Sequence, residues 1–311
     1  MAKTAFLFPG QGSQFVGMGK DLFEEFSFVR DIFDMTDDLC KAHIRKLCFN
    51  GPMEDLTHTV NCQPAITVVN LACLAALAKE GAGPDAAAGH SLGEFCALAA
   101  AKSLSFEDAT SLVTVRARLM HREALANPGA MLAILGLDFD AVGQITSKAS
   151  SDGLVGIANH NAPTQIVITG SCEGVAKAGQ LAKEQKAKCI PLKVSGAWHS
   201  ALMEKAGQEF APLVENAPFA DAAMPVALNV TGKLEQSARA IQEIMTCQLT
   251  SPVLWCDCVK ALFDSGVDTF VEVGPGKVLT GLAKKILGSE NDLRFFNVDG
   301  LLGLEAYLKE R

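Results

Sequence analysis

A serine between two glycines is the first residue of this chain with the setting of a nucleophile. Residues 89–94 read Gly-His-Ser-Leu-Gly-Glu, so Ser91 lies in a Gly-x-Ser-x-Gly pattern. A small apolar run, 86–88, precedes it, and an almost continuously apolar segment, 95–101, follows it. These flanks predict a buried strand, a sharp turn that glycines permit, and a buried helix whose free N–H groups favour developing negative charge. An ordinary glycine-rich connection between a strand and a helix would have the same sequence pattern. A base and an anion site elsewhere in the chain are therefore needed to favour a catalytic serine.

Arg116 is the residue that most needs a binding partner. The cap pattern at Ser105 predicts a helix to about Leu125, and helical spacing puts Arg116 in the middle of its apolar stripe. A buried guanidinium without an anion is very costly. Two explanations remain open: a salt bridge to an Asp or Glu of this chain, or a carboxylate on a substrate, which arginine grips with two parallel hydrogen bonds.

The best candidate for a base is His199. It follows a predicted strand end in Gly-Ala-Trp-His-Ser, residues 196–200, where the chain would cross back between two domains. Pockets tend to form at such junctions. A histidine packed beside tryptophan is an equally good interpretation. His90 adjoins Ser91, but neighbouring side chains at a strand end point to opposite faces, so its imidazole is not expected to reach the serine oxygen.

A glycine-rich loop lies near the start of the chain. An apolar run, 5–8, predicts a short buried strand, and Gly-Gln-Gly-Ser-Gln follows it at residues 10–14. A dinucleotide-binding interpretation fails because the third glycine is not at the required spacing. The loop can bring backbone N–H groups close to a ligand beyond the strand end, although a plain glycine turn fits as well.

The elements that must position these residues predict an α/β protein. Its 311 residues suit one large domain with a smaller insertion. Strands over 226–230 and 269–273 add to the strands over 5–8 and before Ser91, which predicts a mainly parallel sheet. Residues 130–194 are typical of the strand and helix order βαββαβ, a ferredoxin-like arrangement. The expected domains are a large α/β catalytic domain, 1–126 and 196–311, and an inserted subdomain, 127–195.

Composition excludes several classes of protein. A net charge of −8 argues against general nucleic-acid binding, and 49% hydrophobic residues indicate a well-packed core. Ten cysteines are scattered, and Cys256-Asp-Cys258 is a poor zinc or redox pair, so free thiols in a reducing compartment and no metal are expected. The N-terminus has no secretory character, and the apolar run 65–78 is too short to span a bilayer. We therefore expect a cytoplasmic protein.

Five segments, taken in order, resemble the malonyl-CoA:acyl carrier protein transacylases of fatty acid synthesis. They are residues 8–14, 89–94, 115–117, 196–200 and 272–276, and they extend over nearly the whole chain. Each motif is only moderately specific, but the ordered set is highly specific. The resemblance implies a hydrolase-like α/β core with an inserted ferredoxin-like subdomain.

The resemblance also implies catalytic roles. Ser91 would attack the malonyl thioester with His199 as general base, which forms a malonyl-serine ester and releases coenzyme A. The phosphopantetheine thiol of acyl carrier protein would then take the malonyl group in a ping-pong cycle. Backbone N–H groups of Gln11 and Leu92 would form the oxyanion hole. Arg116 would pair with the malonyl carboxylate.

Further positions near the pocket follow from the same resemblance. A main-chain carbonyl at Gln248, in place of an acidic residue, would accept the His199 N–H, which makes a dyad. Asn161 and Gln63 match family positions near the pocket. Trp198 stands where many members have phenylalanine. A bulky aromatic there should crowd an α-branched acyl group, so malonyl is expected over methylmalonyl.

The expected ligands and partners are malonyl-CoA and phosphopantetheinylated acyl carrier protein, with no bound cofactor, nucleic acid or membrane, and a monomeric chain. Lys188, Lys284 and Lys285 could form a basic patch for the carrier protein, although solvated lysines are the simpler interpretation. A stand-alone polyketide synthase acyltransferase would share every motif. A thioesterase or proofreading hydrolase could use the same dyad, but it would not need Arg116.

Overall fold

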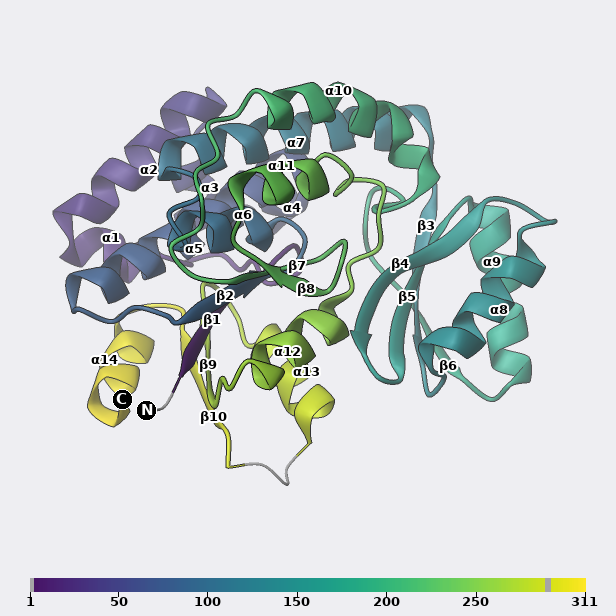
Figure 1. Ribbon diagram of the computed structural model, residues 1–311. Coiled ribbons are helices and arrows are strands. Elements are labelled where there is room, and N and C mark those ends of the chain that lie inside the picture. Colours follow the sequence, from purple (N-terminus) through teal and green to yellow (C-terminus); the bar gives the residue numbers. More distant parts are fainter. Residues whose placement is uncertain (1–2, 289–291) are drawn as a thin grey trace.

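Two β-sheets organise the chain in the computed structural model, which describes residues 3–288 and 292–311 (Figure 1). The larger sheet has the strand order β10-β9-β1-β2-β7-β8, and all neighbours are parallel except β7 and β8. This confirms the predicted α/β class with a mainly parallel sheet. The strands are β1 (Thr4–Phe8), β2 (Ala86–Gly89), β7 (Val226–Leu228), β8 (Lys233–Glu235), β9 (Thr269–Val273) and β10 (Arg294–Val298).

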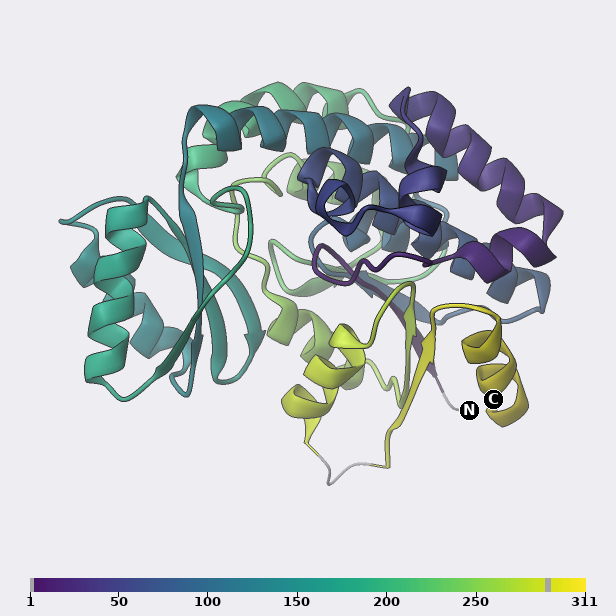
Figure 2. The same cartoon turned by 180° about the vertical axis from the view of Figure 1, so that it is seen from behind.

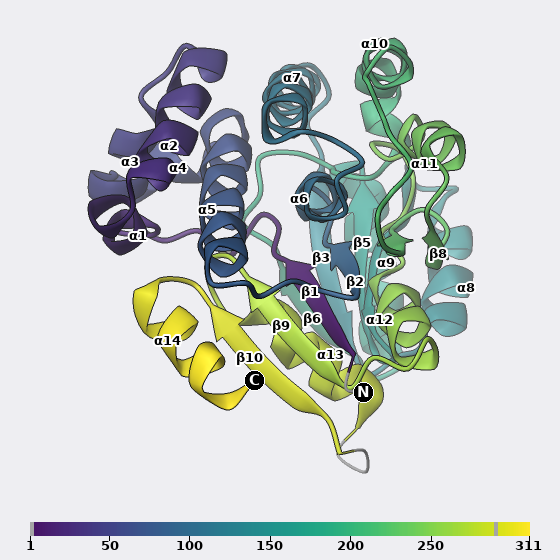
Figure 3. The ribbon, with the colours of Figure 1, turned by 60° about the vertical axis from the view of Figure 1, so that its left-hand side comes forward.

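Helices cover both faces of the larger sheet, which is why its central strands are apolar throughout (Figure 3). Alternate residues of β1 point to opposite faces. Phe6 and Phe8 join the apolar cluster under one helical layer, whereas Ala5 and Leu7 join the cluster under the other. The first layer contains α5 (Thr59–Lys79), α6 (Gly93–Ala100), α7 (Phe106–Ala126) and α14 (Leu301–Glu310), and the second contains α12 (Trp255–Asp264) and α13 (Val278–Leu287).

The second sheet belongs to a ferredoxin-like subdomain whose βαββαβ order was predicted from the sequence. Its strand order is β4-β5-β3-β6, and every pair is antiparallel. Helices α8 and α9 pack on the face turned away from the larger sheet (Figure 2). The elements are β3 (Ala130–Leu135), α8 (Phe139–Ala149), β4 (Val155–Ala162), β5 (Gln165–Gly170), α9 (Cys172–Glu184) and β6 (Lys188–Pro191).

Main-chain hydrogen bonds tie this subdomain to the segment that precedes α12. The N–H of His160 donates to the carbonyl of Val253 at 2.9 Å, and the N–H of Val253 donates to the carbonyl of Ala158 at 2.8 Å. Strand β4 therefore continues its pairing into the larger domain. The remaining helices cover the outside of the molecule; they are α1 (Lys20–Glu25), α2 (Ser27–Cys40), α3 (Ile44–Asn50), α4 (Met53–Thr57), the 3-10 turn Ala201–Met203, α10 (Glu204–Glu215) and α11 (Ala238–Met245).

Helix α5 is longer than the apolar run 65–78 of the sequence. It begins at Thr59 and includes Pro64. A proline in the second turn removes one main-chain hydrogen bond and crowds the carbonyl four residues before it, a cost that the burial of most of the helix offsets. The complete helix is long and apolar enough to span a membrane, contrary to the expectation from the shorter run. However, 83% of its most apolar window is buried inside the protein, as in a core helix.

Candidate active site

The predicted elbow is formed by the turn between β2 and α6. Ser91 has a φ of 53°, in the left-handed region that is rare for residues other than glycine. The flanking glycines are required by close backbone contacts. A Cβ on Gly89 would lie 2.0 Å from the carbonyl carbon of Gly93, and a Cβ on Gly93 would lie 2.1 Å from the carbonyl oxygen of Phe8. The turn therefore presents Ser91 at the N-terminal end of α6.

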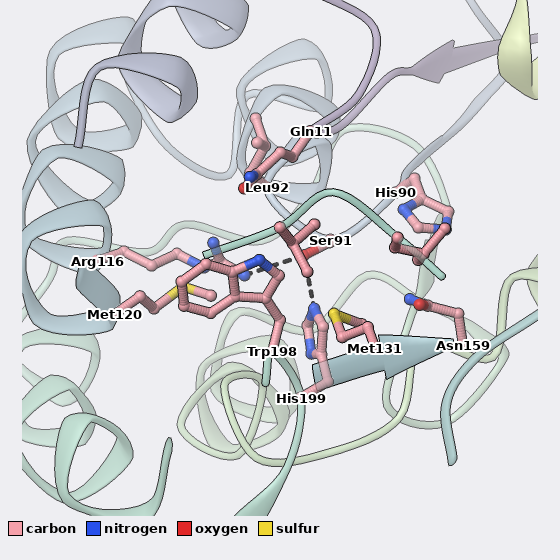
Figure 4. A pocket seen from close by; sticks show the side chains of 12 residues that line it. Gln11, His90, Ser91, Leu92, Arg116, Met120, Met131, Asn159, Trp198 and His199 are labelled. Atoms are coloured by element: carbon pink, nitrogen blue, oxygen red, sulfur yellow. Dashed lines mark hydrogen bonds between the residues drawn. The ribbon is translucent and has the colours of Figure 1, made fainter. Parts of the chain in front are cut away.

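Ser91 and His199 form a hydrogen-bonded dyad (Figure 4). The Ser91 Oγ lies 2.7 Å from the His199 Nε2. On the other side of the ring, Nδ1 lies 3.1 Å from the carbonyl oxygen of Gln248 and 3.0 Å from that of Ser251. Carbonyls only accept hydrogen bonds, so Nδ1 carries the proton and Nε2 is free to accept one from Ser91. In the described part of the chain, no carboxylate bonds to this ring.

His199 is neutral at physiological pH. The side chain is only 5% exposed, and this burial, followed by the positive charge of Arg116, lowers the pKa of His199 to about 3. The two carbonyl contacts oppose this shift but do not reverse it. A neutral imidazole can take up a proton at pH 7, as a general base must.

The neutral state leads to a prediction about titration. In protein labelled with ¹³C-histidine, we expect the His199 ring signals to stay at their neutral positions from pH 8 down to pH 5. The neutral form is favoured because the pKa of about 3 lies below the ordinary value, so protonation begins only well below pH 5. A His199→Gln variant identifies the signals by their loss. A midpoint near the ordinary histidine value, about 6.5, would contradict the prediction.

Arg116 is a buried cation whose fixed partners are all uncharged. Its side chain lies on α7 and is 1% exposed. Nε donates to the Gln248 Oε1 at 3.0 Å, one terminal nitrogen donates to the Gln63 Oε1 at 2.6 Å, and the other donates to the Ser91 Oγ at 3.0 Å. Burial lowers the pKa of Arg116 to about 10, so the group remains charged at neutral pH.

The salt bridge that was one explanation for Arg116 does not form among the described residues, where no carboxylate oxygen lies within 4.0 Å of its guanidinium. A buried cation held only by amide and hydroxyl oxygens is well suited to an anionic ligand. Its position 3.0 Å from the Ser91 oxygen places that ligand beside the nucleophile.

Gln11 and Leu92 line the same space as Ser91 and Arg116. Leu92 caps the N-terminus of α6, and Gln11 lies in the loop after β1. Gly10 lets this loop approach the elbow, because a Cβ there would lie 2.4 Å from the carbonyl oxygen of His90. Neither the Gln11 nor the Leu92 N–H donates to an acceptor within residues 3–288 and 292–311. Both groups are therefore available to bind an oxyanion.

One small pocket of about 100 Å³ is lined by Ser91, His199, Arg116, Gln11 and Leu92, with Trp198 along one wall (Figure 4). A second cavity, of about 200 Å³, adjoins it and shares Gln11, His90 and Leu192. Asn161 lines only the second cavity, where its Oδ1 lies 2.9 Å from the His90 Nε2. His90 thus bonds away from Ser91, as its place at the strand end suggested. Of the other residues predicted near the pocket, Gln63 and Gln248 bond to Arg116 but do not line the pocket, and Lys188, Lys284 and Lys285 lie outside it.

The sequence did not predict that Met131, Asn159 and Leu192 line the pocket, nor the contacts that Ser251, Asn229 and Glu94 make at this site. Ser251 supplies the second carbonyl to His199. Asn229 accepts the Ser91 N–H at 2.7 Å, and Glu94 is fully buried beside it. Glu94 did leave a signal: it is a carboxylate on α6, whose other residues are apolar or glycine. Asn229 and Ser251 left no such signal in the sequence, because each lies far along the chain from the residue that it contacts.

Known proteins resemble this chain over almost its full length. Residues 5–303 match a family model described as an acyl transferase domain. Together with the elbow and the dyad, this match defines the protein as an acyltransferase. The malonyl CoA-acyl carrier protein transacylases of Bacillus subtilis and Staphylococcus aureus (strain COL) are 46% and 41% identical to it, over 92% of this chain and 91% and 93% of theirs. The chain belongs to the malonyl CoA-acyl carrier protein transacylase family.

Solved structures agree with this assignment. The acyl-carrier-protein S-malonyltransferase of Burkholderia pseudomallei is 38% identical and superposes with a TM-score of 0.92, covering 99% of both chains. A malonyl-transacylase solved in complex with a type II polyketide synthase acyl-carrier protein is 37% identical, with a TM-score of 0.94 and coverage of 100% of both chains. The predicted fold is therefore confirmed by close structural relatives.

Proposed function

We propose that this chain transfers a malonyl group from malonyl-CoA to the phosphopantetheine thiol of an acyl carrier protein. The observation that carries the proposal is Arg116, a buried cation with uncharged partners, 3.0 Å from the Ser91 oxygen. A malonyl group carries its own carboxylate, which this cation can bind. Family membership supports the same reaction, and one relative was solved with an acyl-carrier protein bound to it.

In the first half-reaction, the Ser91 Oγ attacks the thioester carbon, and its proton passes to the Nε2 of His199. The N–H groups of Gln11 and Leu92 hold the oxyanion that forms, while Arg116 holds the malonyl carboxylate. When the oxyanion collapses, the carbon–sulfur bond breaks and the imidazolium returns the proton to coenzyme A. The product is a malonyl ester on Ser91.

In the second half-reaction, the phosphopantetheine thiol enters where coenzyme A has left. His199 takes the thiol proton, and the sulfur attacks the ester carbon. Collapse of the second oxyanion breaks the bond to the Ser91 Oγ, which recovers the proton from His199. One malonyl group has then moved from one thiol to another, and no cofactor is consumed.

Intact-mass analysis of the wild-type chain tests this proposal. With malonyl-CoA we expect a malonyl adduct that maps to the peptide containing Ser91 and that disappears when a phosphopantetheinylated carrier protein is added. Acetyl-CoA should label much less. Equal labelling by both donors would contradict the role of Arg116, and adduct loss to water without transfer would indicate a hydrolase.

A polyketide synthase acyltransferase remains the second candidate, because one relative is a malonyl-transacylase solved with a type II polyketide synthase carrier protein. The chemistry at Ser91 is the same in both cases. Transfer rates to a fatty acid carrier protein and to a polyketide carrier protein, measured side by side, separate the two. A cytoplasmic setting is part of the proposal, supported by ten cysteines that are all unpaired.

We propose that Trp198 limits the size of the acyl group. The indole is 5% exposed, and a Cβ on Gly196 would lie 2.8 Å from its ring, so the ring is packed tightly. We expect Trp198→Ala to raise the use of methylmalonyl-CoA relative to malonyl-CoA by roughly tenfold in a competition assay, since one methyl group is worth 1–3 kcal/mol in such a pocket. Trp198→Phe, which keeps most of the bulk, is the control. Unchanged selectivity in the alanine variant would defeat the idea.

We propose that Lys188 and Lys285 contribute to the surface that receives the carrier protein. Both flank one end of the smaller sheet: Lys285 donates to the Gln165 Oε1 at 3.2 Å, and Lys188 and Gln165 pair with the same residue of β3. Lys284 instead lies over the Phe295 ring, which argues for a smaller contribution to the surface that receives the carrier protein.

Charge reversal tests this surface. We expect Lys188→Glu and Lys285→Glu each to raise the KM for an acidic carrier protein about threefold to tenfold, while acylation by malonyl-CoA stays unchanged. Lys309→Glu, at the exposed end of α14, is the matched control. No change in KM in the first two variants would remove them from the docking surface.

A further inference from the structure

We infer that Glu94 is a positioning residue that holds the serine elbow and Arg116 in their working geometry, through Asn229 and Gln248. The inference rests on the proposed function, because it concerns how the same site selects an acyl group that carries a carboxylate. The Glu94 side chain is not hydrogen-bonded to Ser91 or His199, and only its main-chain N–H reaches Ser91, at the carbonyl, at 3.1 Å, so the carboxyl group acts through its two partners.

Glu94 is a fully buried carboxylate in the first turn of α6. Its Oε1 accepts the main-chain N–H of Asn229 at 2.7 Å, and its Oε2 accepts the Nε2 of Gln248 at 2.9 Å. A buried carboxylate is costly unless its oxygens are satisfied. Here each oxygen binds one donor, and both donors belong to residues that reach the catalytic centre.

The first arm of this arrangement runs through Asn229 to the elbow. The Asn229 Oδ1 accepts the N–H of Ser91 at 2.7 Å, and its Nδ2 donates to the carbonyl of Gly89 at 2.7 Å. The side chain therefore bonds on both sides of His90, within the turn where Ser91 adopts its left-handed conformation. Glu94 fixes the main chain from which this clamp extends.

The second arm runs through Gln248 to Arg116. The Gln248 Nε2 donates to Glu94 and also to the carbonyl of Ser91 at 2.9 Å, which leaves its Oε1 to accept from the Arg116 Nε at 3.0 Å. A carboxylate only accepts hydrogen bonds, so Glu94 determines which end of this amide faces the arginine. A flipped amide would direct its NH₂ group at the guanidinium.

The two charges also act on each other across this amide. Burial raises the pKa of Glu94 to about 7, against the opposing effects of its hydrogen bonds and of Arg116. In turn, the charge of Glu94 raises the pKa of Arg116 against the effect of burial. Gln248 is thus the link between the buried carboxyl group of Glu94 and the cation that would bind the substrate carboxylate.

The test compares Glu94→Gln with the wild type in the acylation half-reaction, with malonyl-CoA and acetyl-CoA as separate donors. Glutamine has one acceptor oxygen, so its NH₂ group must face a donor on one of the two arms. We expect kcat/KM to fall about 100-fold for malonyl-CoA and roughly fivefold for acetyl-CoA, since a misdirected hydrogen bond to a charged group weakens the binding of the malonyl carboxylate most. The preference for malonyl therefore falls about 20-fold.

Glu272→Gln is the matched control. Glu272 is also fully buried, but it binds the N–H groups of Val278 and Thr280 at the start of α13 and the Nδ2 of Asn297. Its replacement should lower stability without changing the preference between the two donors. If Glu94→Gln loses activity but keeps the wild-type preference, its role is structural only and the inference is overturned.

Gln248→Met decides the question if Glu94→Gln does not fold. This variant removes the amide but keeps the main-chain carbonyl that lies 3.1 Å from the His199 Nδ1. A lowered malonyl preference supports the second arm, in which the Gln248 amide positions Arg116, and an unchanged preference overturns the inference. The wild type in the same assay distinguishes failure of this inference from failure of the proposed function. If the wild type forms no malonyl adduct, the proposed function itself fails.

Discussion

A chain with Ser91 replaced by alanine is expected to gain no malonyl group from malonyl-CoA, because the other residues of the pocket offer no nucleophile at the same position. His199→Gln should acylate about 10³- to 10⁴-fold more slowly than the wild type, the usual range for loss of a base from a serine dyad or triad. Its substrate affinity should change little, since Arg116 and the two oxyanion donors remain.

His90→Gln is the matched control for this prediction. His90 is adjacent to Ser91 in the chain, but it bonds to Asn161 at 2.9 Å and its ring lies 5.5 Å from that of Trp255. We expect its replacement to slow acylation by no more than about tenfold. Rapid-quench mass spectrometry of each variant measures the rates. A larger loss of acylation rate in His90→Gln than in His199→Gln would show that His90, and not His199, is the base.

Arg116→Met is expected to lower kcat/KM for malonyl-CoA by about 10²- to 10³-fold, since it leaves the substrate carboxylate in a buried site without its cation. Acetyl-CoA has no such carboxylate. Its kcat/KM should therefore change by less than about fivefold, so the variant loses the preference for malonyl. Methionine keeps much of the length of the arginine stem and its contacts with α7 neighbours.

Arg118→Met provides the comparison on the same helix. Arg118 is exposed on α7 and donates to the carbonyl of Cys40 at 2.8 Å, away from the pocket. Both donors should be used by this variant as by the wild type. If Arg116→Met instead loses malonyl and acetyl transfer equally, the guanidinium supports the fold of the pocket and does not bind the carboxylate.

Local features of the sequence were enough to single out Ser91 and Arg116, which the structure places side by side in one pocket. Ser91 was visible because glycines, a strand and a helix surround it within a short segment. Arg116 was visible because helical periodicity placed it on an apolar face, and the structure shows it 1% exposed. The βαββαβ order of the smaller sheet was also readable, since each of its elements has a clear period.

Contacts between distant segments were not predictable in the same way. Asn229 is 138 residues from Ser91 in the chain, and the Gln248 side chain is 132 residues from Arg116. Nothing in the local pattern of either residue reports such a contact. The resemblance indicated a carbonyl at Gln248, but not the amide contact with Arg116. Short edge strands such as β8 were missed because three residues carry too little periodicity.

The pairing between β4 and Val253 has a consequence for building chimeras. The segment that pairs with the smaller sheet immediately follows Gln248 and Ser251, whose carbonyls hold His199. The inserted subdomain is therefore hydrogen-bonded to the segment that holds the His199 ring, although the two are separate in the chain. Grafting residues 127–195 from a relative would change only one side of this contact. A functional exchange has to carry residues 246–254 with it.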